Sequence, residues 1–537
     1  MKGDFSRISF DAKNHFSRVL LQQGRVTLDA DPNEEASILL HYLRTLARDL
    51  IGPCGGPVDN LGFGLNVDTS VAGKPGLKIG AGRYYVDGIL VESDAEYDYA
   101  HQPDFTPPAS DAVLQWLAKP STDVWFYLDV WERHVSWIEN DAIRESALGG
   151  PDTCSRTQVV WQVRALARAT LVERLSAKRD AIDARLADTS GVLSAAERAA
   201  LQAQRDKFDA DLTLLAPNAD GQAATDCTAP LDSLDGLSDA LMTVRLDPGQ
   251  QIKDPCVLSP DALYRGVENH LYRVEVHRGS APGVKPSFKW SRDNGSVVTR
   301  WLATEGANGN ELVVDSSRGF EAGRWVELSD EASDQLGVPG LLVKLAKVEA
   351  GRLTVDPTSV PTGQTIVLTT DRIRPKVRRW DQTETDDITL DMGAVPLAET
   401  SATAAVWIDL EDGIQVQFAK AGSYRSGDYW LIPARVASGT IEWPFTLDAN
   451  GVRLWQARAP LGVEHHYAPL GWGLATGQLN DVSCLCTIDP INSCSIAARR
   501  GNRAENPSRP GRPAPATAPA HPPVRPAPAQ APRRPNP

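Results

Sequence analysis

The sequence predicts a mainly β, multi-module protein made of β-hairpins, a small β-barrel-like module and a β-sandwich-like region. It also predicts an N-terminal amphipathic helix, an inserted antiparallel helical hairpin and a disordered C-terminal tail rich in Pro and Arg. Short apolar runs separated by Gly, Pro and Asp recur along most of the chain, as expected of strands and turns. Helical periodicity is confined to two stretches. The 537 residues also exceed the roughly 100–200 residues that one hydrophobic core usually serves.

The N-terminal module, residues 1–105, is expected to combine a helix with a hairpin. Asp31 can cap a helix, Pro32 suits its first turn and Gly52 can end it. Residues 83–92 form two β-rich runs around Asp87-Gly88, a dipeptide that supplies the positive φ angles of a tight turn. The helix should present one apolar face, because large side chains recur at spacings of three and four: Ile38, Leu39, Tyr42, Leu43, Leu46 and Leu50.

A central β module is expected at residues 106–164 and 217–304, interrupted by a helical hairpin at 165–216. The capping box that begins at Ser194 predicts the start of the second helix. The outward positions of the hairpin are charged, so it either protrudes into solvent or forms an arm that binds a partner. Its two helices carry apolar seams at heptad spacing: Leu171, Leu175, Ile182 and Leu186, then Leu201, Phe208, Leu212 and Leu215.

The second half of the chain is expected to be β-rich and then disordered. Residues 305–375 hold five short strand-like runs, which suggest a small barrel-like module: 312–314, 325–328, 342–345, 353–355 and 366–368. A C-terminal β module at 376–480 is followed by a Cys-containing segment at 481–498. Residues 499–537 are rich in Pro and Arg and lack apolar periodicity, so they cannot bury enough surface to offset their chain entropy.

The charge distribution argues against nucleic-acid binding. The net charge is −14, and residues 499–537 contain eight Arg and one Glu, which leaves about −21 for the rest of the chain. An acidic surface cannot neutralise phosphates. No apolar run is long enough to span a membrane, and residues 1–7 do not resemble a signal peptide, so synthesis in the cytoplasm is expected. The basic tail could dock an acidic or proline-binding surface.

Histidines and cysteines near the C-terminus supply the candidate metal ligands. Three interpretations stay open for this group: a metal site, a labile disulfide, or free thiols. Seven Cys spread over a long chain do not form the disulfide framework of a small secreted protein. The candidate ligands are His465, His466, Cys484, Cys486 and Cys494.

Acidic and aromatic residues raise the possibility of carbohydrate chemistry. Asp409, Glu411 and Asp412 could act as the acid and base of a glycoside hydrolase, or form an acidic turn between two strands. The 14 Trp and 11 Tyr could stack on sugars, although burial in strands is their usual role. The acidic run from Asp29 begins like a calcium loop but has Glu34 and Leu40 where Gly and Glu are required. Common nucleotide, nucleophile and zinc-protease motifs are absent, so no catalytic residue and no cofactor is expected.

Seven stretches resemble a family of uncharacterised bacterial proteins, a domain of unknown function whose members are encoded among genes for contractile, phage-tail-like injection systems. The helical hairpin and everything after about Leu479 depart from that pattern. The stretches are residues 1–7 (MKGDFSR), 15–31, 264–275, 288–295 (FKWSRDNG), 379–382 (RWDQ), 424–435 and 464–470.

The resemblance implies a non-enzymatic structural part of such a particle, at the baseplate, the fibre attachment or the tail end. Its partners would be other particle proteins in a homo- or hetero-oligomeric assembly, released from the cell with the particle. A carbohydrate-binding or glycoside-acting protein and a cargo protein are the alternatives. The motif residues would be structural: Asp29, Asp31, Glu268, Asn269, Trp290, Asp293, Asn294, Arg379, Trp380, Tyr424, Arg425, Asp428, Trp430, His465 and His466.

Overall fold

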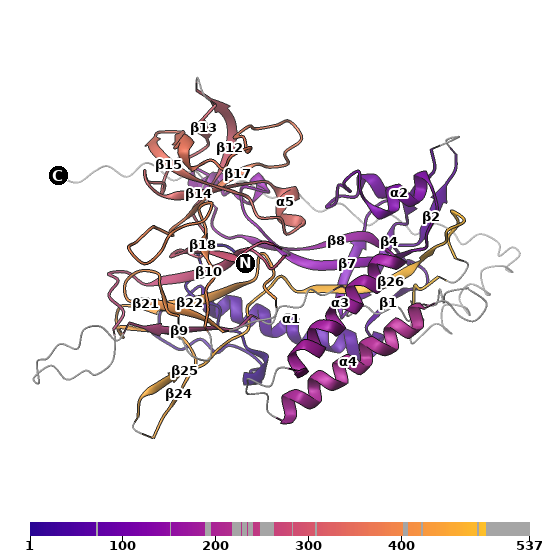
Figure 1. Cartoon of the computed structure of the whole chain (residues 1–537), viewed down its shortest axis with the longest axis horizontal. Helices are drawn as coiled ribbons and strands as arrows, with labels where there is room; N and C mark the ends of the chain where they lie inside the picture. The colour runs from indigo at the N-terminus through magenta and orange to yellow at the C-terminus, as the bar shows by residue number, and fades with distance from the viewer. Residues whose placement is uncertain are drawn as a thin grey trace, which may run out of the picture. The chain divides into compact units, whose positions relative to one another are not determined.

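The computed structural model describes residues 1–70, 74–150, 152–187, 195–216, 227, 234, 240–247, 263–281, 283–306, 309–400, 406–419, 423–449, 451–480 and 483–489. Within these residues strands outnumber helices, which confirms the mainly β class (Figure 1). The predictions for Ser194, for Cys494 and for the tail at 499–537 concern residues outside this description.

The hairpin predicted around Asp87 and Gly88 is present. Strand β4 (Gly82–Val86) pairs antiparallel with β5 (Ile89–Ser93), and the two turn residues have φ angles of +48° and +81°. Alternate residues of both strands are buried, so one face of the hairpin packs on the core. Around it lie β1 (Cys54–Pro57) and β27 (Thr487–Ile488) in the same sheet, and β2 (Leu65–Asp68), β3 (Gly76–Ile79) and β6 (Tyr97–Asp98) in a second one.

The N-terminal helix begins earlier than the sequence predicts. Helix α1 spans Ala30–Ile51 and has Asp29 at its N-cap position. The prediction of Asp31 as the cap is therefore wrong; its carboxylate accepts a hydrogen bond from the backbone N–H of Leu28 at 2.9 Å. Pro32 still falls in the first turn, where the missing N–H is not needed. Gly52 ends the helix as predicted, with φ +93°.

A three-stranded antiparallel sheet forms the centre of the first half. Strand β7 (Val124–Val135) lies between β8 (Arg156–Ala167) and β26 (His465–Gly473). Phe126 and Leu128 on one face join the core beneath the β4–β5 hairpin, whereas Trp125 and Tyr127 on the other face pack on a separate cluster. Helix α2 (Ala112–Ala118) and the 3₁₀ turns Tyr99–His101, Asp141–Ile143 and Ser146–Leu148 lie in the connecting segments.

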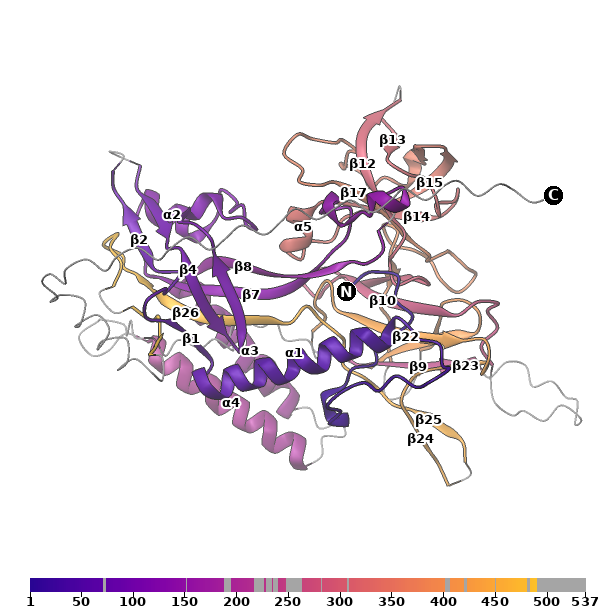
Figure 2. The same cartoon turned by 180° about the vertical axis from the view of Figure 1, so that it is seen from behind.

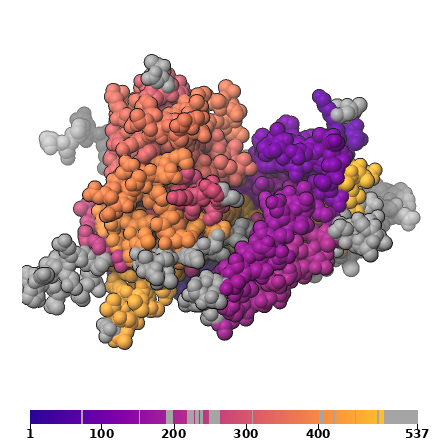
Figure 3. Space-filling view, in the orientation of Figure 1, coloured from indigo at the N-terminus to yellow at the C-terminus, as the bar shows by residue number. Residues whose placement is uncertain are grey.

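The predicted helical hairpin consists of α3 (Arg168–Ala187) and α4 (Ala195–Leu215), which lie side by side (Figures 1 and 3). Their antiparallel orientation follows from contacts whose sequence numbers run in opposite directions: Arg205 binds Asp183 at 2.6 Å, and Arg198 donates to the carbonyl of Leu186 at 2.9 Å. The hairpin does not stand free of the body. Its seam packs on the second face of the central sheet, in one cluster with Trp125, Tyr127 and Trp472: Leu171, Leu175, Ile182, Leu201, Phe208 and Leu215.

The second half contains a large core between two sheets. One sheet has the order β18–β11–β10–β22–β23 and the other contains β9, β19, β20 and β21. Tyr272, Trp290 and Trp430 from the first sheet share a core with Ile414 and Phe418 from the second. The strands are β9 (Met242–Leu246), β10 (His270–Arg278), β11 (Ser287–Ser291), β18 (Val395–Pro396), β19 (Glu399–Thr400), β20 (Ile408–Asp409), β21 (Ile414–Ala419), β22 (Tyr429–Arg435) and β23 (Thr440–Ile441), with a separate ribbon of β24 (Phe445–Leu447) and β25 (Arg453–Trp455).

The barrel-like module is a closed barrel of six strands, but its membership differs from the prediction. The run 366–368 is not a strand, although Ile366 is buried in the barrel core. The barrel closes instead through the first and last strands of the module, which pair with each other. In barrel order the strands are β12 (Val298–Glu305), β13 (Glu311–Val314), β16 (Arg352–Val355), β15 (Leu341–Glu349), β14 (Trp325–Ser329) and β17 (Lys376–Trp380); helix α5 (Glu331–Gln335) and the 3₁₀ turn Pro357–Ser359 connect them.

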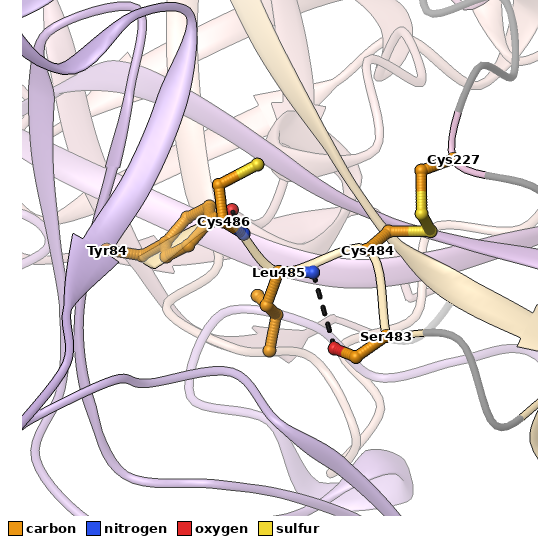
Figure 4. Close-up of a disulfide and its surroundings, with 6 residues drawn as sticks. All are labelled: Tyr84, Cys227, Ser483, Cys484, Leu485 and Cys486. Atoms are coloured by element: carbon orange, nitrogen blue, oxygen red, sulfur yellow. Dashed lines mark hydrogen bonds between the residues drawn. A yellow bond between two sulfur atoms is a disulfide. The ribbon is translucent and has the colours of Figure 1, made fainter. Parts of the chain in front are cut away.

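One disulfide joins two distant parts of the chain. Cys227 and Cys484 are bonded, although they are 257 positions apart in the sequence (Figure 4). Close by, the backbone N–H of Cys486 donates to the Tyr84 hydroxyl at 3.0 Å. The segment around Cys484 is therefore held on the N-terminal module, where β27 pairs in parallel with β1.

Candidate functional site: an anchored N-terminal segment and an exposed apolar surface

The first residues of the chain dock on strand β10 and the turn after β11. The carbonyl oxygen of Met1 accepts hydrogen bonds from Arg273 Nη1 at 3.1 Å and from Asn294 Nδ2 at 3.2 Å. Asn294 Nδ2 also donates to the carbonyl of Gly3 at 2.9 Å. Asn294 is buried in the left-handed region, with φ +50°. A turn residue of the FKWSRDNG motif thus fixes the opening of the chain.

A buried network of charges lies beneath this segment. Glu275 Oε1 is 3.0 Å from Lys2 Nζ and 3.3 Å from Lys289 Nζ, and Glu275 Oε2 accepts from Arg273 at 2.6 Å. Lys289 also binds Glu327 at 2.5 Å. Burial opposes ionisation of Glu275, but Lys2, Arg273 and Lys289 outweigh it and hold its pKa well below the usual range. Leaving a buried charge without its partner costs free energy. The loss of any one of these side chains is therefore expected to destabilise the whole network.

Trp380 joins the same network through its ring and its indole nitrogen. Trp380 Nε1 donates to Glu327 Oε2 at 2.9 Å, and the ring centroid lies 4.5 Å from Lys289 Nζ and 5.5 Å from Lys2 Nζ. Burial raises and nearby Lys289 and Lys2 lower the pKa of Glu327, with a net shift downward. Trp380 therefore ties the last strand of the barrel to the N-terminal segment.

Arg379 and Asp293 connect the two motifs directly. Arg379 Nη2 binds Asp293 Oδ2 at 2.6 Å, and Arg379 Nε lies 3.1 Å from Asp381 Oδ1. His270 Nδ1 is 3.2 Å from the other oxygen of Asp293. The structure thus brings four motif residues together around the opening segment: Asp293, Asn294, Arg379 and Trp380. The side chain of Trp290 lies instead in the large core of the second half.

The other motif residues of the second half lie in different places. Tyr424 and Trp430 are buried in its large core, where burial raises the pKa of Tyr424. Asp428 is buried nearby, and its backbone N–H donates to the carbonyl of Arg425 at 3.2 Å. Glu268 and Asn269 are exposed; Asn269 Oδ1 accepts from Val436 N–H at 2.9 Å, and the carbonyl of Glu268 accepts from the Tyr264 hydroxyl at 3.0 Å.

The candidate metal ligands are not brought together in the described part of the chain. His465 Nδ1 lies 2.6 Å from Asp129 and His466 Nδ1 lies 3.0 Å from Asp87, on different neighbours. Cys484 is in the disulfide, and Cys486 is reduced and exposed. Among the residues that the structure describes, no three His, Cys, Asp or Glu side chains form a group suited to a metal ion.

The three acidic residues weighed as hydrolase carboxylates lie in and beside a turn between two strands. Asp409 Oδ1 accepts from Gln415 at 2.7 Å, and Glu411 binds Arg292 at 2.5 Å. Burial raises the pKa of Glu411, although Arg292 opposes the shift. Asp412 has φ +52° and is followed by Gly413, also with positive φ. This is the geometry of an acidic turn, with each carboxylate held by a neighbour.

The hollows beside the barrel differ in their lining: one is mainly apolar, with Ile138, Trp301 and Leu302, and the other is mainly polar. Their lining includes Arg133, Glu139 and Arg374. Arg133 and Arg374 both bind the buried carboxylate of Glu331, and Glu139 binds Lys376 at 2.9 Å. Lys376 holds the pKa of Glu139 down to about 2 despite burial. The charges are paired with one another, as expected of a junction between parts of one protein.

A different kind of surface follows the anchored opening. Ser6 N–H donates to Asp29 at 2.9 Å and Ser9 donates to Glu34 at 2.6 Å, so residues 15–28 form a loop that is closed at its base. We call this loop the arm. The motif residue Asp29 therefore ties the start of the arm to its end. Val19 is partly buried, whereas five other large apolar side chains of the arm are exposed: Phe16, Leu20, Leu21, Val26 and Leu28.

Helix α1 follows the arm in the sequence and lies at the front of the view in Figure 2. Only Ala30 and Ile38 among its residues are buried, whereas six large apolar side chains are exposed: Leu39, Leu40, Tyr42, Leu43, Leu46 and Leu50. Periodicity finds the apolar face but does not reveal whether the chain covers it. Sequence reasoning also missed the buried charge network; its signal is that Glu275 and Lys289 stand between large apolar residues in strands that are buried almost throughout.

Comparison with known proteins gives the family of the chain but no function. A family model described as a family of unknown function (DUF6519) matches residues 1–535. The chain belongs to this family. Curated proteins and solved structures yield no match. The match includes the helical hairpin and the C-terminal tail as well as the motif stretches. Among the described residues of this family member, the helices are too short or too polar to cross a membrane.

Proposed function

We propose that this chain is a non-enzymatic structural component of a contractile injection system or a related phage-tail-like particle, in the baseplate, the fibre attachment or the tail end. The observation that carries the proposal is the arm and α1 together. They expose eleven large apolar side chains between residues 16 and 50. Exposed apolar surfaces of this extent are characteristic of sites that bind other proteins.

The way in which this surface is held supports an assembly role. The arm begins and ends at fixed points, because the opening residues are tied to the buried charge network and Asp29 is tied to Ser6. A surface that is already ordered loses less conformational entropy when it binds. The resemblance of the motif stretches to proteins encoded among injection-system genes supplies the class of particle.

The proposal is tested by purifying particles from a producing strain and from a strain that lacks this gene. We expect mass spectrometry to detect the chain in wild-type particles and electron microscopy to find incomplete particles in the deletion strain. Complementation with Leu20→Glu/Leu21→Glu should fail to restore assembly, whereas Val267→Glu, at an isolated exposed position, should restore it. Absence of the chain from purified particles would contradict the proposal, and normal particles without it would indicate cargo.

A further inference from the structure

The exposed face of α1 has the spacing of a coiled-coil seam. Leu39, Leu43, Leu46 and Leu50 follow one another at intervals of four, three and four residues, which are the a and d positions of a heptad repeat. Each of the four side chains is more than half exposed. Leu40 and Tyr42 flank them at e and g positions. A seam of this kind buries its side chains only when a second helix lies along it.

The opposite face of α1 is fixed to the body, so the helix cannot rotate to bury the seam. Ile38 is buried, Arg44 binds Glu132 at 2.8 Å, and Arg48 lies 3.5 Å from Asp87. The β4–β5 turn also approaches the helix closely. A Cβ atom on Gly88 would lie 2.1 Å from the carbonyl oxygen of Arg44.

The chain's own C-terminal segment does not match the seam. Residues 490–537 contain Ile491, Ile496 and Val524 as their only large apolar side chains, and these are spread among Pro, Ala and Arg. Prolines recur every few residues from 507 to 537, and nowhere in residues 490–537 do large apolar residues follow one another at intervals of three and four, so this sequence contains no heptad seam to match that of α1. None of the described residues covers the seam either, so we look for its partner helix in another chain.

The seam is complementary to itself. In a parallel pair, each leucine meets the same leucine of the other helix. In an antiparallel pair, Leu39 faces Leu50 and Leu43 faces Leu46, because the two pairs have the same midpoint in the sequence. Either arrangement gives uninterrupted apolar layers along a helix about 33 Å long. Symmetric contacts between identical surfaces are also the commonest basis of oligomers.

We infer that α1 packs along α1 of a second copy of the chain in a coiled coil built on Leu39, Leu43, Leu46 and Leu50. The inference rests on the proposed function only in treating α1 as an assembly surface, and it names the partner of that surface. It concerns the isolated protein, so it can be tested without any particle.

The test measures the molar mass of the full-length chain by light scattering across a wide range of protein concentrations. We expect wild-type protein to form dimers or larger oligomers, at a multiple of the 58.2 kDa of one chain. Leu43→Glu/Leu46→Glu should reduce the mass to that of one chain without lowering the melting temperature of the monomer, because both positions are exposed. The matched control is Leu447→Glu/Leu454→Glu, which alters two exposed leucines of the β24–β25 ribbon and should leave the mass unchanged.

A second variant, Leu43→Cys/Leu46→Cys, places thiols at the centre of the seam, where they meet in either orientation of the helices. Mild oxidation should produce a cross-linked dimer on a non-reducing gel, and the wild-type chain with its own cysteines is the control. Monomeric wild-type protein, or an oligomer that survives Leu43→Glu/Leu46→Glu, would overturn the inference. A monomeric chain that is still found in particles would leave the proposed function standing, whereas an oligomer missing from particles would contradict the proposed function alone.

Discussion

The helices α1 and α3 carry the same kind of apolar seam but use it differently. In α3, Leu171 and Leu175 are completely buried against α4 and the central sheet. In α1, Leu43 and Leu50 are 62% and 72% exposed. The chain supplies a partner for the seam of α3 and none, among the residues described, for that of α1. An apolar stripe in a sequence therefore indicates that something will cover it, but does not say whether the same molecule does.

The ion pairs of the helical hairpin and of α1 differ in the same way as their apolar seams. Charged pairs cross from one helix of the hairpin to the other, as in Arg205–Asp183. In α1, two arginines instead bind carboxylates of the body, in the pairs Arg44–Glu132 and Arg48–Asp87. The hairpin is stabilised by contacts within one chain. Helix α1 is attached to the body by one face, and its other face remains exposed to a partner.

The largest difference is expected from removing one leucine of each seam. Leu171→Ala should lower the free energy of unfolding by about 2–5 kcal/mol, because it leaves a cavity in a packed cluster. Leu43→Ala should change it by less than about 0.5 kcal/mol in chains kept monomeric by dilution, because the side chain is exposed. Urea denaturation of both variants measures the two values. Equal losses in the free energy of unfolding would show that Leu43 is as buried in the monomer as Leu171.

The attachment of α1 can be weakened without touching its seam. Gly88→Ala should cost about 3 kcal/mol or more, because φ is +81° and the new Cβ atom would collide with the carbonyl of Arg44. Gly149→Ala is the matched control: φ is +87° and no atom lies within 4 Å, so backbone strain of about 1–2 kcal/mol is all that is expected. Thermal unfolding measures both, and hydrogen exchange should show faster opening of α1 only in the first variant.

Acid should affect the N-terminal attachment before it affects the hairpin seam. His134 packs edge-on against Phe5, and burial, with the nearby N-terminal ammonium and Arg378, lowers its pKa to about 4. In the unfolded chain this pKa is about 6.5. The unfolded state therefore binds the proton first, so stability present above pH 6.5 is lost as the pH falls towards about 4, by up to roughly 3 kcal/mol.

This pH dependence is measured by hydrogen exchange of residues 1–9 across the window, with residues 171–182 as the internal reference. The buried members of the hairpin seam do not titrate. His134→Gln should make the pH profile of the N-terminal segment shallower while leaving the reference unchanged; some dependence remains, because burial also lowers the pKa of the Met1 ammonium to about 4. A profile unaffected by the substitution would remove His134 as its cause.

The smallest effect is expected from the ion pair that orients α1. Arg44→Ala removes a partly exposed contact with Glu132 and should cost about 0.2–1 kcal/mol. Glu132→Gln should cost about the same, and the double variant should be less destabilised than the sum of the two single variants. Strict additivity in thermal unfolding would show that the two side chains do not interact in solution.

Much of the architecture could be predicted from local patterns. Asp87-Gly88 predicted a hairpin because few residues adopt two successive positive φ angles, and the heptad spacing of Leu171 and Leu175 predicted the paired helices. The start of α1 was less accurate, because Asp29 and Asp31 both suit an N-cap, and the Asp29 side chain accepts from the distant Ser6 N–H instead of capping the first turn. The barrel was predicted as a small β module, but its closure by β12 and β17 depends on pairing between distant strands.

The candidate site was only partly accessible to sequence reasoning. The motifs containing Asp293 and Arg379 could be found separately, but their contact across 86 positions is visible only in the fold. The same holds for Lys2 and Glu275, whose charges are buried together. The exposed state of Leu43 could not be predicted, because spacing is identical for a seam covered within the chain and one covered by another chain.

The pairing of β26 with β7 has a consequence for how the protein is made. His465 meets Asp129 across 336 positions, and Cys484 is bonded to Cys227 across 257. During translation, β7 and the surface that receives β27 leave the ribosome long before their partners exist. We expect the nascent chain to expose an unpaired edge of β7 until β26 has been synthesised, which makes it a substrate for chaperones and makes N-terminal fragments prone to aggregate.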